Sequence, residues 1–190
     1  IILDLGINNF NTRNIAQNNQ LFTKHFSKIF TLKITLSIIY LIVLLCVGYF
    51  LNYGFKELKW LFIIGFNQVL VAIILYIRSN LSALLQFKKD GLLSVADRLV
   101  LILFCGYFIW GIKNSSVISI EFFIYSQTFA YLLTILIGLI FLFKHSSFPK
   151  LLLDPLFFKL IIKKSFPYAL LIFLMSIYYY SDVVLSLIHI

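Results

Sequence analysis

The chain has 190 residues, of which 62% are hydrophobic and only 12% are charged. A soluble domain is about 25% charged because its surface must be solvated, so the composition excludes a soluble globular protein. The net charge of +9 comes from Lys and Arg in short segments between apolar runs, a pattern typical of membrane-protein loops. Nucleic acid is therefore not an expected partner.

The apolar runs predict an all-α polytopic membrane protein. Each run is close to the roughly 20 residues that span a bilayer, and none alternates as a membrane strand does, so we expect about five transmembrane helices. In chain order, we expect a basic segment at 1–33, spans at about 34–51, 60–87, 95–112 and 120–143, a link at 144–165, and a last span at 166–184.

The distribution of Lys and Arg orients these spans. Basic residues are frequent at 1–33, 88–98 and 144–165 and sparse in the other links, which places these three segments in the cytoplasm under the positive-inside rule. The link at 144–165 mixes Pro, Lys and apolar residues. It fits either a short amphipathic helix in the membrane interface or a plain loop. Pro167 suits the first turn of the last span.

One face of the span at 60–87 is polar. At about 100° per residue, Asn67, Arg78, Ser82 and Lys89 fall within a narrow sector, with Gln68 at its edge. An arginine that faces lipid costs at least about 2.5–3.5 kcal/mol. Either Arg78 reaches up to the headgroups, or this face borders a polar cavity. The extent of the polar stripe favours the cavity.

Three other groups of polar residues are expected to have simpler roles. Asp97 and Arg98 would open the span at 95–112, with Ser94 as its cap, in a structural role. The last span carries Tyr178 and Asp182 on one side, which suits sugar rings or the membrane interface. The span at 120–143 aligns small and polar residues on one face that favours helix packing: Gln127, Tyr131, Thr134 and Gly138.

The sequence offers no candidate catalytic, cofactor-binding or metal-binding residues. His25 and His145 lie in basic segments without a carboxylate nearby, and Cys46 and Cys105 lie in apolar runs without metal-site spacing. The sequence also contains neither a phosphate-binding glycine loop nor a nucleophile elbow. We therefore expect a protein that is not an enzyme.

Both ends of the sequence suggest a piece of a longer protein. The chain begins with Ile and opens within an apolar pattern, so we expect it to be a fragment. Its last six residues, LSLIHI at 185–190, resemble the translated read-through of a sequencing adapter.

Three stretches resemble polysaccharide flippases of the multidrug/oligosaccharidyl-lipid/polysaccharide exporter superfamily. DLGINNFNTRNIAQN at 4–18 and YIRSNLSALLQFKKDGLLSVADRLVLI at 76–102 resemble two cytoplasmic connections of that family with their flanking helices. SFPYALLIFLMSIYYYSDVV at 165–184 resembles the opening of its second helical lobe, although Ser181 stands where the family often has a basic residue.

The resemblance implies a larger two-lobe helical transporter in the bacterial inner membrane. This chain would supply four helices of the first lobe and the first helix of the second. Its substrate would be a polyprenyl-linked oligosaccharide for cell-surface polysaccharide. Membrane lipids and glycan polymerase or export proteins would be its partners. Substrate-path candidates are then Arg78, Asn67, Gln68, Ser82, Tyr178 and Asp182.

Three alternatives remain open. A drug or cation antiporter of the same superfamily would have acidic residues in the first lobe, and few are present. A membrane-embedded glycan transferase or polymerase would have catalytic His, Asp or Glu and a large external loop. A fragment of this length could also form no closed cavity by itself and have no activity alone.

Overall fold

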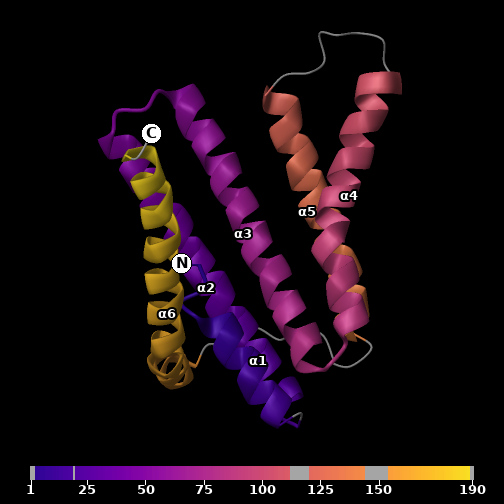
Figure 1. The fold of residues 1–190 in the computed structure, drawn as a ribbon, viewed down its shortest axis with the longest axis vertical. Helices are drawn as coiled ribbons and strands as arrows, with labels where there is room; N and C mark the ends of the chain where they lie inside the picture. Colours follow the sequence, from indigo (N-terminus) through magenta and orange to yellow (C-terminus); the bar gives the residue numbers. More distant parts are fainter. Residues whose placement is uncertain (1–2, 19, 112–119, 144–153, 189–190) are drawn as a thin grey trace.

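The computed structural model describes residues 3–18, 20–111, 120–143 and 154–188, which form six α-helices without a strand among them (Figure 1). Five of these helices are long and apolar enough to cross a membrane, and the eleven-residue α1 is not among them. The all-α polytopic class is thereby confirmed. The helices are α1 (Ile7–Gln17), α2 (Leu21–Phe50), α3 (Phe55–Ala83), α4 (Phe87–Gly111), α5 (Ile120–Phe143) and α6 (Pro155–Ile188).

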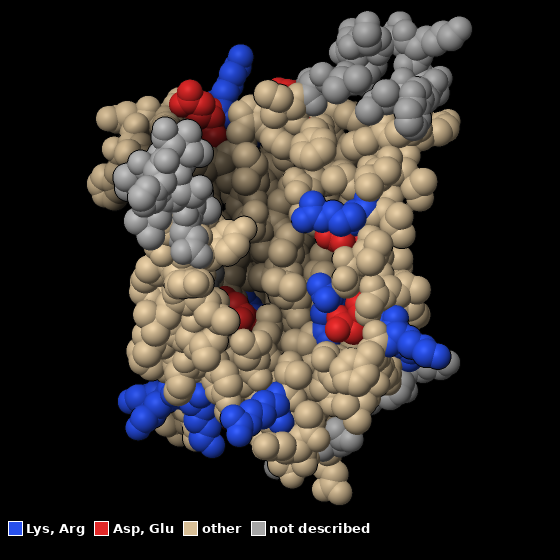
Figure 2. Space-filling model, in the orientation of Figure 1, with Lys and Arg blue, Asp and Glu red and all other residues tan. Residues whose placement is uncertain are grey.

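The five long helices run alternately up and down, and α3 lies at their centre (Figure 1). It packs against α1 and α2 on one side and against α4 and α5 on the other, while α6 contacts α1 and α2. The turn from α3 to α4, the start of α6 and the helix α1 all lie at the lower end in Figure 1, where Figure 2 shows basic side chains gathered. This arrangement agrees with a cytoplasmic side at this end, which stays a prediction, but the predicted cytoplasmic link at 88–98 is wrong because these residues belong to α4.

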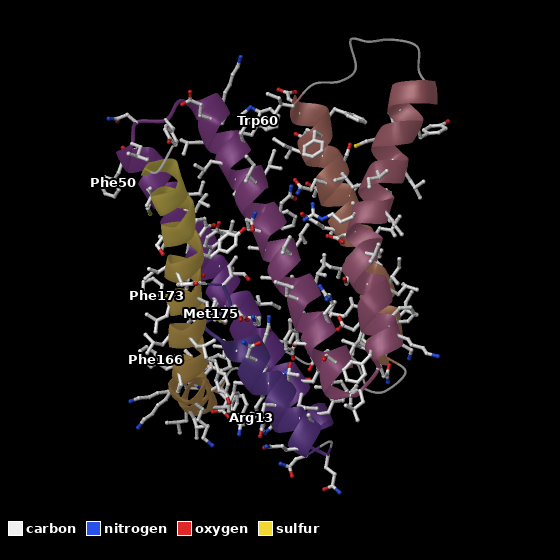
Figure 3. All side chains as sticks on the ribbon, in the orientation of Figure 1. Arg13, Phe50, Trp60, Phe166, Phe173 and Met175 are labelled. Atoms are coloured by element: carbon white, nitrogen blue, oxygen red, sulfur yellow. The ribbon has the colours of Figure 1, made fainter. Side chains whose placement is uncertain are left out.

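The outer surface of the helices is apolar. Phe166 and Phe173 point outward from α6 (Figure 3) and are 63% and 47% exposed, and Phe50 at the end of α2 is 81% exposed. In a soluble protein such side chains would be buried. Here they suit a lipid environment, because lipid tails are as apolar as the side chains themselves.

The helix break between α3 and α4 differs from the prediction. Leu85 adopts a left-handed conformation with φ of 59°, and the Gln86 N–H donates to the Leu81 carbonyl at 2.9 Å. α3 therefore ends at Ala83 and α4 begins at Phe87, in place of the predicted 60–87 and 95–112. The hydropathy pattern missed this turn because it contains Leu84 and Leu85. The polar stripe does not continue to Lys89, which belongs to α4.

α6 also begins earlier than predicted, at Pro155, and continues through Pro167. Pro155 suits the first position of the helix because it has no N–H that would be left unpaired there. Pro167 removes one hydrogen bond from the interior of α6, which membrane helices tolerate. The placement of Pro167 in a first turn is thus wrong, and the last part of the predicted 144–165 link is helical. Residues 144–153 lie outside the described residues.

An ion pair ties the start of α6 to α2. Asp154 accepts a hydrogen bond from Lys28 Nζ at 2.7 Å and another from the Phe157 N–H at 3.2 Å. The hydrogen bond from Lys28 is the main reason that the pKa of the Asp154 carboxyl lies below its usual range, and the hydrogen bond from the Phe157 N–H adds to the effect. Lys28 Nζ also lies 4.9 Å from the centre of the Phe157 ring, over its face.

Two glycines allow close contacts between helices. At Gly138 of α5, an added Cβ would lie 2.8 Å from Ile77 Cγ2 of α3, which confirms that this face of α5 serves packing. At Gly6, just before α1, an added Cβ would lie 2.5 Å from the backbone nitrogen of Ala169 in α6. Gly6 has φ of 70°, a left-handed conformation that other residues adopt at a cost.

We predict that Gly6→Ala lowers the thermal unfolding midpoint of the purified protein in detergent. The left-handed backbone alone costs a residue with a Cβ about 1–2 kcal/mol. The overlap with α6 adds to this cost, because the neighbouring atom is backbone and cannot rotate away. The matched control is Gly91→Ala in α4, where an added Cβ has no neighbour within 4 Å and helix propensity improves. Equal midpoints for the two variants would contradict the close α1–α6 contact.

Candidate functional site

A polar cavity of about 690 Å³ opens between α1, α3, α4 and α6. Figure 2 shows the hollowed face, with acidic and basic side chains adjoining each other along its walls. The cavity is lined from the α1 side by Asp4, Asn8, Asn9, Thr12, Arg13 and Ala16, from α3 by Leu75, Arg78, Ser79 and Ser82, and from α4 and α6 by Asp90 and Tyr168. Hydroxyl, amide, guanidinium and carboxylate groups thus share one space.

Arg78 lies on the cavity wall in an ion pair with Asp90. Its Nε donates to Asp90 Oδ1 at 2.8 Å, and the two side chains are 31% and 21% exposed. Asp90 lies in the first turn of α4, just across the Leu84–Gln86 turn. Neither interpretation of Arg78 from the sequence, snorkelling or cavity lining, included an ion pair with Asp90. The structure places Arg78 at a cavity and also neutralises its charge.

The α1 wall is held against α3 by hydrogen bonds between polar side chains. Asn11 Nδ2 donates to Asn80 Oδ1 at 3.0 Å, and Asn80 Nδ2 donates to the Tyr76 carbonyl at 2.7 Å. The Tyr76 hydroxyl donates to the Phe26 carbonyl of α2 at 2.9 Å. These buried groups link α1, α3 and α2. Asn80 uses both ends of its amide in these contacts, whereas the buried Asn11 Oδ1 has no hydrogen-bond partner among the described residues.

Two further contacts complete the cavity walls. The Thr12 hydroxyl lies within hydrogen-bond distance of both the Asn8 carbonyl, at 2.9 Å, and the Ser79 carbonyl, at 3.2 Å. Arg13 lies at the lower end of α1 (Figure 3), and its Nη1 donates to the Tyr168 hydroxyl of α6 at 3.0 Å. This hydrogen bond joins α1 to α6 at the edge of the cavity.

A second ion pair, between Lys33 and Asp4, is more deeply buried. Lys33 of α2 is 3% exposed, whereas Asp4 is 26% exposed and reaches the cavity. Lys33 Nζ also lies 3.4 Å from the Leu3 carbonyl, and Asp4 Oδ1 accepts the Asn8 N–H at 3.3 Å. The pair fastens the segment before α1 to α2.

We predict an asymmetric loss of stability when this pair is broken. Asp4→Asn leaves the Lys33 charge buried and unpaired, and loss of one partner of a buried pair costs about 3–5 kcal/mol. Lys33→Met leaves Asp4, which can be hydrated from the cavity, so its effect is smaller. The double variant, Asp4→Asn with Lys33→Met, recovers most of the stability that Asp4→Asn alone loses, because no unpaired charge stays buried. Thermal unfolding in detergent measures all three, and an equal loss for both single variants would contradict the difference in burial.

The polar stripe of α3 divides between two environments. Arg78 and Ser82 line the cavity, whereas Asn67 is buried against α5. The Thr128 hydroxyl donates to Asn67 Oδ1 at 2.7 Å, and Asn67 Nδ2 donates to the Ile124 carbonyl at 3.4 Å. Gln68 is exposed on α3 away from the cavity lining. Asn67 thus joins α3 to α5 through its hydrogen bonds. It was predicted to line the substrate path, but it does not line this cavity.

Of the two candidates on α6, Tyr178 lies apart from this cavity. Tyr178 is 70% exposed and borders a separate hollow of about 490 Å³ whose lining comes from α6 alone. The side chain of Asp182 lies outside the described residues. The structure therefore does not bring Tyr178 to Arg78.

Sequence reasoning missed most of the cavity residues. Asp90 could have been found from the sequence. Once the turn at Leu85 is recognised, Asp90 is a carboxylate at the start of the next helix, close to the end of the helix that carries Arg78. Asp4 and Tyr168 carry no such local signal, and neither does Asn11 behind the cavity wall, because their partners are distant in sequence. Throughout the described ranges, no group of three or more His, Cys, Asp or Glu is placed to hold a metal ion.

The start of α4 also changes the position of Asp97 and Arg98. Both were expected at the first turn of a helix beginning at 95, but α4 begins at Phe87, so they lie within it. Arg98 is 69% exposed, and its Nε lies 3.6 Å from Asp97 Oδ2. The capping role predicted for Ser94 and Asp97 is therefore wrong.

The five long apolar helices, with a polar cavity among the helices, define a multi-pass membrane protein. A family model described as "Polysaccharide biosynthesis protein" matches residues 1–188, and the chain belongs to this family, the polysaccharide flippases of the multidrug/oligosaccharidyl-lipid/polysaccharide exporter superfamily. The match includes Leu185–Ile188, four of the six residues interpreted as adapter sequence. Neither the curated proteins nor the solved structures that were searched gave a match. A role in polysaccharide synthesis and export follows from the family, whose members are typically transporters rather than enzymes.

Proposed function

We propose that the chain forms part of a flippase that moves a polyprenyl-linked oligosaccharide across the bacterial inner membrane. The observation that carries this proposal is the Arg78 guanidinium on the wall of a polar cavity within a helical membrane protein. The family supports the export of polysaccharide, and the cavity supports the chemical class of the cargo.

The geometry of Arg78 leaves it able to bind an anion. Among the described residues, the guanidinium makes one hydrogen bond, from Nε to Asp90. An arginine has five N–H donors, and its terminal nitrogens match the oxygens of a phosphate. The diphosphate that joins a polyprenyl lipid to its glycan has this chemistry.

The rest of the lining suits the glycan. Ser82, Ser79 and Asn9 offer hydroxyl and amide groups to sugar hydroxyls. The polyprenyl tail needs no polar path, because it remains soluble in the bilayer. A cavity open on one side would thus hold the polar headgroup while the tail stays in lipid. Membrane lipids and the glycan polymerase or export proteins that act on the same cargo are the partners this role requires.

The cavity does not favour a cation antiporter. Its two carboxylates, Asp4 and Asp90, are each paired with a basic side chain, Lys33 and Arg78. A cationic drug would have to displace these partners, one of which is almost fully buried. An anionic cargo meets the terminal nitrogens of Arg78, whose Nε is paired with Asp90.

We predict that Arg78→Ala abolishes complementation of a bacterium that lacks its own flippase for a matching surface polysaccharide. The complete gene containing this sequence would be expressed, and surface glycan and membrane protein levels measured together. Loss of charge-assisted hydrogen bonds worth about 1.5–3 kcal/mol would lower transport about tenfold or more. Arg78→Lys keeps the charge without the planar fork and retains partial activity.

The matched control is Lys56→Ala, which removes an exposed cation at the opposite end of α3. It should restore glycan as well as the unchanged protein. Full restoration by Arg78→Ala at an equal protein level would remove Arg78 from the path. It would leave the ion pair with Asp90 as the sole role of Arg78.

A further inference from the structure

Arg98 has an unusual position for a charged residue. It lies eleven residues after Phe87, the first residue of α4, which is itself a candidate membrane span from Phe87 to Phe108. At about 1.5 Å per residue, its Cα is about 16 Å along the helix, near the middle of a hydrocarbon core of about 30 Å. An arginine at this depth cannot easily reach either headgroup layer.

Arg98 is nevertheless exposed in this chain. Its side chain is 69% exposed, and among the described residues its ion-pair partner is its own neighbour Asp97, at 3.6 Å. This distance is too long for a hydrogen bond, so the guanidinium donors are uncommitted. A charge that faced lipid here would cost at least about 2.5–3.5 kcal/mol. This side of α4 must therefore meet water, a polar ligand or another polar surface.

The position of Arg98 relative to Arg78 suggests which of these it meets. Asp97 lies seven residues after Asp90, within about 20° of the same face of α4. The contact with Asp97 draws the Arg98 guanidinium toward that face. Arg98 is then about 12 Å further along α4 than Asp90, the partner of Arg78.

We propose that Arg98 is a second binding position for the anionic group of the transported lipid, deeper in the membrane than Arg78. This inference rests on the proposed flippase function. A diphosphate crossing a bilayer needs a cation along the way, because its charge is as costly in lipid as that of arginine. Each guanidinium has a carboxylate beside it, Asp90 for Arg78 and Asp97 for Arg98. That carboxylate weakens the hold on the anion enough for release, as transport requires.

The test measures whether water and a prenyl diphosphate reach the Arg98 position. Arg98→Cys is made in the full-length protein with its native cysteines, Cys46 and Cys105 among them, replaced by Ala, and the protein is placed in lipid nanodiscs. A charged, membrane-impermeant methanethiosulfonate reagent should modify it at least about tenfold faster than Leu103→Cys, because thiolate forms in water and not in lipid. Leu103 is 70% exposed on the same helix and serves as the matched control.

The probe for the anion is geranylgeranyl diphosphate. It should slow modification of Arg98→Cys and leave Leu103→Cys unaffected. Val95→Cys, one turn away and 50% exposed, keeps Arg98 in place and should show the same protection, so the test does not depend on folding of the Arg98 variant. Binding of the probe to the protein without cysteines, with and without Arg78→Ala, is measured in parallel.

Two results would overturn the inference while the flippase function stands. In one, the probe binds in an Arg78-dependent manner, yet Arg98→Cys and Val95→Cys react as slowly as Leu103→Cys. In the other, both react rapidly but are not protected by saturating probe. Absence of any Arg78-dependent binding would instead contradict the proposed function, and the inference with it.

Discussion

The hydrogen bond between Asn11 and Asn80 is the interaction on which the cavity depends. α1 has eleven residues and cannot span a bilayer, so its position depends on its contacts with α3 and α6. Ile7 and Ile15 pack into the apolar core that α1 shares with α3. The polar link within this contact is the pair Asn11 and Asn80, which are 1% and 0% exposed, and amides in an apolar environment must find partners. The contact of Gly6 with α6 fixes the other side of α1. Without α1, the Arg78 wall would open toward lipid.

Three basic residues within the helices, Lys33, Arg78 and Arg98, differ in how exposed they are, and this difference separates structural from functional roles. Lys33 is buried and paired with Asp4, which suits a fastening between α2 and the segment before α1. Arg78 is partly exposed, paired through one nitrogen, and borders the cavity. Arg98 is largely exposed, and its only close carboxylate in the described part of the chain is its neighbour. The more exposed the cation, the more of its hydrogen-bonding capacity is left for a ligand.

The class of fold could be predicted from the sequence because hydropathy is a local property. The place of Arg78 and Ser82 on a cavity wall could be predicted because helical periodicity is local too. It misplaced the α3–α4 turn, since Leu84 and Leu85 continue the apolar run while Leu85 reverses the chain. This error carried Lys89 into the polar stripe and Arg98 to a helix start. Asn67 has the same periodicity as Arg78 but binds Thr128 of α5, and no local pattern distinguishes a helix contact from a cavity wall. Asp4, Asn11 and Tyr168 depend on contacts between distant parts of the chain.

The most direct measurement is flipping itself, in liposomes that contain the purified full-length protein. A polyprenyl-diphosphate oligosaccharide with a fluorescent glycan would be placed in both leaflets, and an impermeant quencher added outside. The account predicts that the protein makes the inner pool accessible, and that Arg78→Ala, reconstituted in the same amount, does so at least about tenfold more slowly. Equal rates for the two proteins, or no movement above that of protein-free liposomes, would contradict a path for the anionic lipid past Arg78.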